Sequence, residues 1–310
     1  HVTIHSNFNQ LHWGYLSPLL VSEKNINLIS IDSANACIEL TYRVQIKDET
    51  YNVREYFRLK KGSDRLYLME YDRTANQIIN DNNRVIVNGK IINGIVDEEI
   101  EVSESPAGSV VAFVQQNSLY SFNTSGQLTR IFSFRDDKND DARTRYNAND
   151  IKVLSIDESG NTYFIVYGYL SRGIHEGTTG VVLYYYDAVV NTIEEQIYIP
   201  YTKNWQMLKM DMEKLSYINV RNQMYLFVDG AVYSVNLQNK TVDTVADNLN
   251  ENKFVSSGNN KMIAWQTGDS VIEYNSIQYY DLDNMTPKNI ESGAGNIVVP
   301  LGFIGEDLVY

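Results

Sequence analysis

Short apolar runs separated by polar turns dominate the chain and predict β-strands along most of its length. Runs such as Tyr163–Tyr169 and Met224–Val228 are rich in β-branched and aromatic residues, which favour strands. Turn signals precede several of these runs, as at Ser105–Gly108 and Glu158–Asn161. Because a strand, a short turn and a second strand form a hairpin, the pattern predicts antiparallel hairpins in series.

The hairpins repeat. A strand that ends in Asn or Asp is followed by a polar turn and a further strand, and the period is roughly fifty residues with one longer interval, as expected for a four-stranded unit. The five Asn or Asp markers are Asp72, Asn123, Asp187, Asn236 and Asp283, and in the last four copies a Tyr precedes the marker by three positions. Asp72–Ile78 and Asp187–Ile193 also share the pattern Asp-x-x-x-Asn-x-Ile, which predicts equivalent turns.

One copy can be divided in full. The predicted strands of this copy are 151–156, 162–170, 181–187 and 192–199. In the next copy Asp229-Gly230 lies between two apolar runs, which is the strongest short signal for a type I′ hairpin turn. Each repeat is therefore expected to be a four-stranded antiparallel sheet with its strands in chain order.

This repeated pattern of strands and turns resembles WD40-like and TolB-type propeller repeats over about residues 50–310. It also resembles the pattern in surface proteins of Gram-positive bacteria. The resemblance implies an all-β protein, a β-propeller of four-stranded antiparallel blades with at least five blades in this chain. No Trp-Asp dipeptide ends a blade here, so we do not expect a true WD40 protein.

The expected domains are a linker or a strand from a preceding module at 1–24 and a propeller at 25–310. The predicted blades are 25–90, 91–135, 148–200, 214–248 and 252–295, with the start of a further blade at 296–310. Residues 201–214 mix helical and strand spacing and are assigned only as a connector. The N-terminus has no Met and no basic or apolar signal region, and the C-terminus interrupts a strand-like pattern. We therefore expect the chain to be a piece of a longer protein.

Charge excludes some partners. The formal net charge is −13 and the pI is near 4.8, which opposes binding to nucleic acid or to an anionic bilayer. The apolar runs fall short of the roughly 20 residues that cross a membrane as a helix. The single cysteine, Cys37, rules out an intramolecular disulfide, and we expect it to be a buried small residue.

Two long connections mark a candidate ligand-binding corner. Residues 171–180 join the second and third strands of the third blade, and residues 133–150 lead into that blade. In a propeller these two kinds of connection emerge on one face. The candidate ligand-binding residues are Tyr169, Arg172, His175, Glu176, Asp137, Asp141, Arg145 and Tyr146. The alternative is a loop that folds back on itself, with Arg172 and Glu176 forming only a local ion pair.

Other chemistry finds little support in the sequence. Asp137–Asp141 begins like a calcium loop, but Ala142 and Ala148 stand where that loop needs Gly and Glu. His1 and His5 supply too few ligands for a metal site. The sequence contains no catalytic elbow, phosphate loop or dinucleotide fingerprint. We therefore expect no cofactor, no metal and no catalytic residue.

The function predicted from the sequence is a non-enzymatic binding or scaffold propeller of a larger bacterial envelope protein, extracytoplasmic and monomeric. Its expected partner is a polar ligand, either a glycan or a peptide, or another envelope protein. One alternative is a propeller hydrolase or lyase acting on polysaccharide or peptide, with His175 as acid or base, Glu176 as its partner and Arg172 binding an anion. The other is a structural or sensory spacer.

Overall fold

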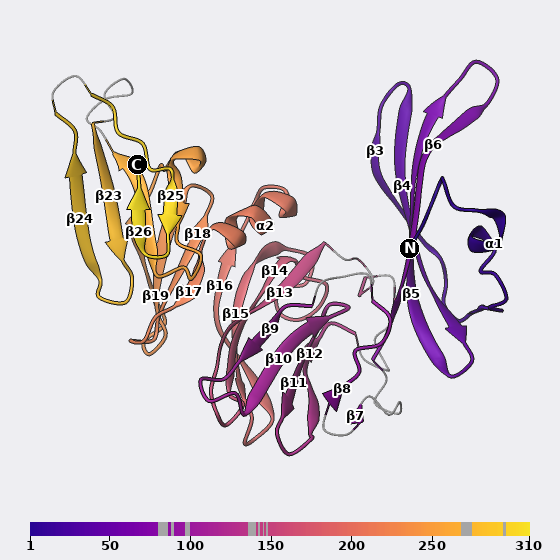
Figure 1. Ribbon diagram of the computed structural model, residues 1–310, viewed down its shortest axis with the longest axis horizontal. Coiled ribbons are helices and arrows are strands. Elements are labelled where there is room, and N and C mark those ends of the chain that lie inside the picture. The colour runs from indigo at the N-terminus through magenta and orange to yellow at the C-terminus, as the bar shows by residue number, and fades with distance from the viewer. Residues whose placement is uncertain are drawn as a thin grey trace. The chain divides into compact units, whose positions relative to one another are not determined.

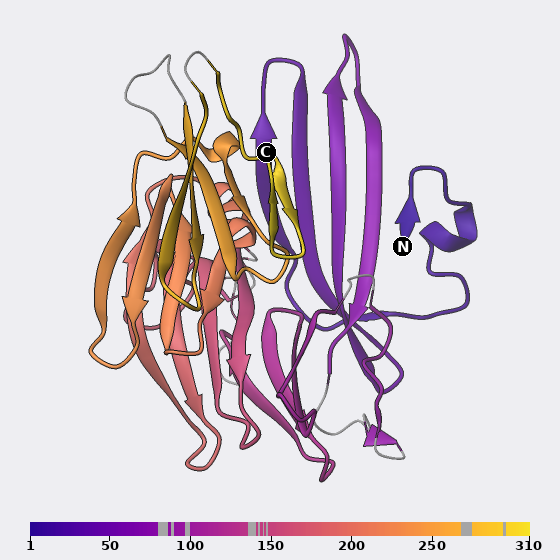
Figure 2. The same cartoon turned by 60° about the vertical axis from the view of Figure 1, so that its left-hand side comes forward.

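The computed structural model describes residues 1–79, 86–87, 90–96, 100–135, 141, 143–144, 146, 148–267, 275–293 and 296–310. The chain forms two compact units, and the strands of each can be followed in Figures 1 and 2. Unit 1 comprises His1–Val102 with Ser109–Tyr146, and unit 2 comprises Ser103–Gly108 with Asn147–Tyr310. The fold is all-β and of the propeller type, as the sequence predicts, because consecutive four-stranded antiparallel sheets follow one another along the chain.

Unit 1 contains a six-stranded sheet. Its order is β1-β6-β5-β4-β2, and β3 also pairs with β4. The strands are β1 (Val2–Thr3), β2 (Leu19–Leu20), β3 (Asn25–Ile31), β4 (Asn35–Ile46), β5 (Glu49–Lys61) and β6 (Leu66–Gln77), with the short helix α1 at Phe8–Leu11. The first repeat is therefore part of a larger sheet with longer strands than a four-stranded blade, and residues 1–24 contribute two of its strands.

The turn expected at Asp72–Ile78 does not form, because β6 runs through it. The alternating inward side chains Tyr71 and Arg73 are both buried. The Arg73 guanidinium lies 4.2 Å from the centre of the Trp13 ring and donates hydrogen bonds to the carbonyls of Gln10 and Leu11. The Asp72 carboxylate contacts His1 instead of capping a turn. These contacts favour a continuous strand over the turn that the local sequence allows.

The second repeat forms a four-stranded sheet in the order β12-β11-β10-β9. Its strands are β9 (Val102–Glu104), β10 (Val110–Gln115), β11 (Ser118–Asn123) and β12 (Leu128–Ser133), and the short hairpin of β7 (Ile86–Val87) and β8 (Lys90–Ile91) precedes them. The strand-ending role predicted for Asn123 is confirmed, since its side chain accepts a hydrogen bond from the backbone of Gln127 across the turn that follows.

Unit 2 contains three further four-stranded sheets, each with its strands in chain order. The first comprises β13 (Asn149–Ile156), β14 (Thr162–Tyr169), β15 (Thr179–Asp187) and β16 (Thr192–Pro200). The second comprises β17 (Ser216–Ile218), β18 (Gln223–Val228), β19 (Ala231–Asn236) and β20 (Thr241–Ala246). The third comprises β21 (Phe254–Ser256), β22 (Met262–Thr267), β23 (Ser276–Asp281) and β24 (Thr286–Glu291). The hairpin of β25 (Gly302–Ile304) and β26 (Asp307–Val309) follows them. The four strands predicted for the fully divided copy are confirmed to within two residues at each end.

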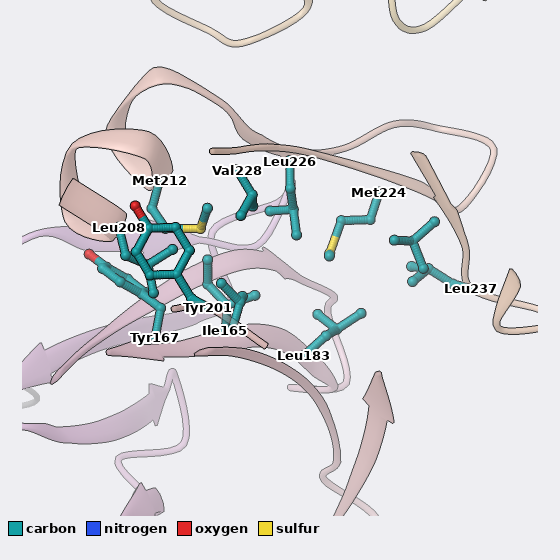
Figure 3. Close-up of a cluster of buried hydrophobic side chains, with 12 residues drawn as sticks. Ile165, Tyr167, Leu183, Tyr201, Leu208, Met212, Met224, Leu226, Val228 and Leu237 are labelled. Atoms are coloured by element: carbon teal, nitrogen blue, oxygen red, sulfur yellow. The ribbon is translucent and has the colours of Figure 1, made fainter. Parts of the chain in front are cut away.

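The sheets of unit 2 pack face to face through apolar side chains (Figure 3). Ile165 and Leu183 of the first sheet meet Met224 and Leu226 of the second in one buried cluster. Phe227 of the second sheet and Trp265 of the third lie in another, so Trp265 is a core residue. Stacked sheets that bury both faces in this way are the packing of propeller blades.

The segment left open at 201–214 is partly helical. Helix α2 spans Trp205–Lys214, and Asn204 caps its first turn by accepting a hydrogen bond from the backbone of Gln206 at 2.7 Å. Leu208 and Met212 lie one turn apart on its buried face and join the cluster between the first two sheets. Because these two apolar residues are buried on one face, the segment forms a helix and not the strand that its mixed spacing also allowed.

Two smaller expectations were wrong. Strand β23 ends at Asp281, not at the predicted marker Asp283, and it is Asp281 that accepts backbone hydrogen bonds from the turn. Cys37 is half-buried, not fully buried, and its Sγ accepts a hydrogen bond from the Tyr56 hydroxyl at 3.2 Å. Cys37 therefore lies on the polar face of its sheet.

Candidate functional site

The loop of residues 170–178 joins β14 to β15 and is the lengthened connection that the sequence singled out. Its ends are closed by two backbone hydrogen bonds, from Leu170 to the Thr178 carbonyl at 2.9 Å and from Gly177 to the Leu170 carbonyl at 3.0 Å. Gly173 and Gly177 have φ angles of 97° and 85°, which residues with a side chain rarely adopt. The glycines therefore let the β14–β15 loop close on itself.

His175 anchors this loop to the outer strand β16. Its Nε2 lies 2.9 Å from the Glu195 carboxylate, and its ring stacks on Tyr198 with centroids 3.8 Å apart and planes inclined by 16°. The Tyr198 hydroxyl donates to Thr178 Oγ1 at 2.9 Å, and Thr178 Oγ1 donates to the His175 carbonyl at 2.7 Å. The loop is thus held by side chains as well as by its own backbone.

The anchoring turns a large apolar side chain outward. Ile174, between Gly173 and His175, is 89% exposed. The neighbouring Glu176 is also exposed, whereas Arg172 is half-buried and Ser171 is buried. An exposed isoleucine on a loop of fixed shape is a ready contact for another molecule, because its burial gains apolar contact at a small loss of loop entropy.

The predicted site residues fall on both units. Tyr169, Arg172, His175 and Glu176 lie in unit 2 at and after the end of β14, and Asp141 and Tyr146 lie in unit 1. Asp141 accepts hydrogen bonds from the side chain of Arg143 at 2.9 and 3.1 Å. Asp137 and Arg145 lie outside the described residues. A shared corner of the two loops therefore stays a prediction.

The partner proposed for His175 was wrong. The carboxylate that meets the imidazole belongs to Glu195, not to the adjacent Glu176. Sequence reasoning missed Glu195 and Tyr198 because both lie on the strand after next, and only the fold-back of the loop brings His175 to them. The available signal was the antiparallel pairing of β15 with β16, which places Tyr198 opposite Val182 and Glu195 opposite Tyr184.

The His175–Glu195 pair is partly open to solvent, with side chains 21% and 30% exposed. An imidazole held by a carboxylate can bind a polar group or transfer a proton. Within the described part of the chain, no three or more His, Cys, Asp or Glu side chains gather in a way that could hold a metal ion. No helix among the described residues is both long and apolar enough to cross a membrane.

Comparisons with known proteins assign no family to this chain. No protein-family model and no curated protein matches the chain. Among solved structures it is similar to a puromycin-hydrolysing peptidase of Mycobacterium tuberculosis, at 8% identity, a TM-score of 0.39, and coverage of 90% of this chain and 47% of that one. It is also similar to dipeptidyl peptidase 4 of Porphyromonas gingivalis, at 10% identity, a TM-score of 0.38, and coverage of 83% and 38%.

A third similar structure is the β-propeller domain of the Trilobed protease from Pyrococcus furiosus, at 10% identity, a TM-score of 0.35, and coverage of 83% of this chain and 69% of that one. The chain spans less than half the length of the two peptidases. At these identities and TM-scores the propeller assignment rests on the sheets of this chain itself.

Proposed function

We propose that this chain is a non-enzymatic binding module of a larger extracytoplasmic protein of the bacterial envelope, and that the β14–β15 loop is its binding surface. The observation that carries the proposal is Ile174, 89% exposed on a loop that His175 fixes to β16. Fixed loops on a rigid sheet scaffold are common binding elements, and a pre-formed loop loses little entropy when it binds.

The chemistry of the loop favours a peptide or protein partner over a glycan. An apolar tip beside a charged residue fits a peptide that offers both an apolar side chain and a polar group. The acidic composition, with a net charge of −13, gives no support to nucleic acid as a partner.

Peptide and glycan arrays test the binding function directly. Ile174→Asp and the triple variant Arg172→Ala/His175→Ala/Glu176→Ala should each bind at least tenfold more weakly than the wild type, because the apolar contact or the loop anchor is lost. Their melting temperatures should stay within a few degrees of the wild type, since the loop lies outside the buried clusters.

Val189→Asp is the matched control. Val189 is 83% exposed and lies in the β15–β16 turn at the other end of the same sheet. The control should bind like the wild type. Equal binding by Ile174→Asp, or equal loss in the control, would contradict the proposed site.

A hydrolase or lyase acting on polysaccharide or peptide is the second candidate, and the His175–Glu195 pair favours it, because a carboxylate can orient an imidazole for proton transfer. His175→Asn keeps a polar side chain without an acid or base. If the wild type releases product from a polysaccharide or peptide substrate and His175→Asn does not, the result would support the enzyme and overturn the binding module.

A further inference from the structure

The six-stranded sheet of unit 1 has one apolar face, and residues 1–24 cover only half of it. Near the β4–β5 turn Trp13 packs against a cluster that includes the buried Val44 and Val53. Beside the β3–β4 and β5–β6 turns the apolar side chains of the same face are open to solvent. The exposed fractions there are 71% for Ile26, 53% for Leu28, 70% for Ile31, 65% for Leu66 and 44% for Leu68.

The exposed side chains belong to continuous rows across four strands, because paired residues of antiparallel strands point to the same side of a sheet. One row is Ile31, Ala36, Leu59 and Leu68, and the next is Leu28, Ile38, Phe57 and Tyr71. These two rows, with Ile26 and Leu66 beyond them, form the open face. Four strands about 4.8 Å apart make the open face about 14 Å wide. Contiguous apolar surface of this kind marks a site of interaction with another molecule.

The charged side chains at the two ends of the open face are both lysines. Lys24 lies over the ring of Tyr42, 5.5 Å from its centre, where the open face meets the covered half. Lys61 follows Leu59 by two positions in β5 and therefore points to the same side. Both lysines are exposed, and neither forms an ion pair with a described residue. Two ammonium groups are thus available to an acidic partner.

Glu55 points to the same face, but its charge is used inside the sheet. Its side chain is 13% exposed, and it accepts hydrogen bonds from the hydroxyls of Tyr42 and Tyr71 at 3.1 and 3.0 Å. Arg73 Nη1 lies 3.9 Å from the same carboxylate. Glu55 therefore presents little negative charge to a molecule on the open face.

Other carboxylates of these strands lie on the opposite face. Glu39 pairs there with Arg54, and Glu70 pairs with Arg58. In a chain whose net charge is −13, an apolar face with cations at both ends has the opposite charge to the molecule as a whole. Complementarity therefore favours a partner that is both apolar and acidic.

We propose that the open face is the docking site for an acidic amphipathic helix of a partner protein. The middle of a paired sheet offers side chains and no unpaired backbone groups, so the partner must satisfy its own backbone hydrogen bonds, as a helix does. A helix about 10–12 Å across matches the width of the face. Its apolar residues at positions i, i+3, i+4 and i+7 pack on the rows.

The two lysines set the length of that helix. Tyr42, beneath Lys24, pairs with Val53, and Lys61 lies eight residues further along β5. Eight residues of strand span about 27 Å, which is the length of about 18 residues of helix. Carboxylates near both ends of such a helix reach Lys24 and Lys61.

The charges select this partner over two others. A second copy of the chain stacked on the same face sets lysines against lysines, which repel one another. An anionic bilayer attracts the two lysines but repels the rest of a chain with a net charge of −13. An acidic helix on another protein meets the open face without either cost.

Fluorescence anisotropy with two labelled helical peptides of about 18 residues tests the docking. Both peptides carry leucine at positions i, i+3, i+4 and i+7, and their outer positions are Glu in one and Lys in the other. The Glu peptide should bind the whole chain, and the Lys peptide should bind at least tenfold more weakly. Equal binding of the two peptides, or binding of neither, would overturn the proposal.

A pair of neighbouring lysines provides the matched charge test. Lys61→Glu should weaken binding of the Glu peptide at least fivefold. Lys60→Glu makes the same change in net charge, but Lys60 lies opposite Asn35 and Tyr67 on the other face of the sheet. It should bind within twofold of the wild type. If both variants lose affinity equally, only the net charge matters and the open face is not the site.

Apolar variants separate this partner from the other two. Ile31→Ser/Leu66→Ser should weaken binding of the Glu peptide at least tenfold, whereas Tyr67→Ser, on the other face, should not. Sedimentation velocity and flotation with phosphatidylglycerol vesicles complete the test. Self-association or vesicle binding that Ile31→Ser/Leu66→Ser abolishes would show a second copy or a bilayer to be the partner instead. Because the open face lies in unit 1 and the β14–β15 loop in unit 2, failure of one proposal leaves the other standing.

Discussion

A single residue type plays different roles according to what surrounds it, and the two aspartates of the shared Asp-x-x-x-Asn-x-Ile pattern show this. Asp187 ends β15, and its carboxylate accepts backbone hydrogen bonds from Val189 and Val190 at 2.9 and 3.1 Å. Asp72 begins the same pattern, but it lies inside β6 and is followed by Arg73 where Asp187 is followed by Ala188. The local pattern allows a turn in both places, and the buried guanidinium of Arg73 decides against it in one.

Loss of the Asp187 carboxylate should therefore weaken the fold. Asp187→Ala removes both hydrogen bonds to the turn. We expect the free energy of unfolding to fall by about 1–2 kcal/mol, which is the usual contribution of such bonds to stability. Asp187→Asn, which keeps an acceptor oxygen, should lose less than half of that. Urea denaturation measures both, and equal losses in the two variants would show that the carboxylate does not hold the turn.

Asp211 provides a second test at the residue scale, because it is an acidic residue that is only 2% exposed. Its Oδ2 accepts a hydrogen bond from the backbone of Asp229 at 2.8 Å, and Lys214 Nζ lies 3.7 Å from Oδ1. Asp211→Ala leaves a backbone N–H of the next hairpin without its acceptor and should cost about 2–3 kcal/mol of stability. The exposed Asp243→Ala should change the free energy of unfolding by less than about 0.5 kcal/mol. Similar midpoints in urea for the two variants would refute this role of Asp211.

At the scale of the hairpin, the turns between first and second strands show what the sequence could and could not reveal. In unit 2 the first residue of each turn caps it with a side-chain oxygen, and the fourth has a positive φ angle. The capping residues are Asp157, Asn219 and Ser257, and the fourth residues are Gly160, Asn222 and Asn260. Because three different residue types do the same work, a search for one repeated residue finds only part of the pattern.

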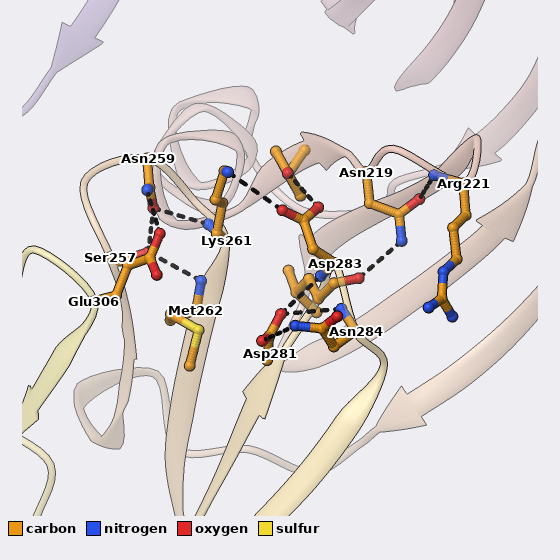
Figure 4. A network of polar contacts seen from close by, with 12 residues as sticks. Asn219, Arg221, Ser257, Asn259, Lys261, Met262, Asp281, Asp283, Asn284 and Glu306 are labelled. Carbon is orange, nitrogen blue, oxygen red and sulfur yellow. Dashed lines mark hydrogen bonds and ion pairs between the residues drawn. The ribbon is translucent and has the colours of Figure 1, made fainter.

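These turns are also linked to the neighbouring elements by side chains (Figure 4). Asn219 donates to the Leu282 carbonyl at 2.8 Å, and Tyr217 donates to Asp283 at 2.7 Å. Lys261 Nζ lies 3.3 Å from the same carboxylate. Asp283, predicted as the end of a strand, thus joins the second and third sheets of unit 2. Such links form only when whole sheets pack together, so a local stretch of sequence does not predict them.

The Asp229-Gly230 hairpin was predictable because its backbone conformation restricts the residue type. Both residues have positive φ angles, 52° and 76°, and Val228 pairs with Ala231 as a type I′ turn requires. Gly230→Ala must adopt a strained φ angle, and its Cβ would lie 3.1 Å from the Leu249 carbonyl.

We expect Gly230→Ala to lower the free energy of unfolding by about 1–2 kcal/mol, from the cost of the left-handed conformation. Gly258→Ala is the control, since Gly258 has no positive φ angle and a Cβ there meets nothing within 4 Å. It should be neutral or slightly stabilising. Urea midpoints that fall equally in the two variants would rule out backbone strain as the cause.

At the scale of the molecule, the period of the hairpins predicted the four-stranded sheets but not the six-stranded one. The sheets from β9 to β24 repeat with similar lengths, so spacing alone locates them. In the first repeat β4, β5 and β6 have 12, 13 and 12 residues, and short strands from residues 1–24 pair with them. The local sequence does not predict that pairing, because Trp13, in the turn after α1, packs against Arg73 of β6, which is sixty positions away in the chain.

The abundance of tyrosine, 23 residues in the chain, gives the whole molecule a sensitivity to high pH. Burial raises the pKa of Tyr51, Tyr71, Tyr184 and Tyr225 to about 12. Unfolded tyrosines ionise near pH 10, so between about pH 10 and 12 the folded state holds more protons than the unfolded state. The stabilising contribution is fully present below pH 10 and is lost as the pH rises through the folded pKa values.

Urea midpoints should therefore fall steeply between pH 10 and 12, and Tyr184→Phe should make that fall shallower. The substitution keeps the ring, which stacks on Phe164 with centroids 5.5 Å apart, and removes only the group that titrates. Tyr15→Phe, at a fully exposed ring, should leave the wild-type slope unchanged. If the midpoint is constant over this range, or if the two variants give the same slope, then burial of the hydroxyls is not what ties the stability of this molecule to pH.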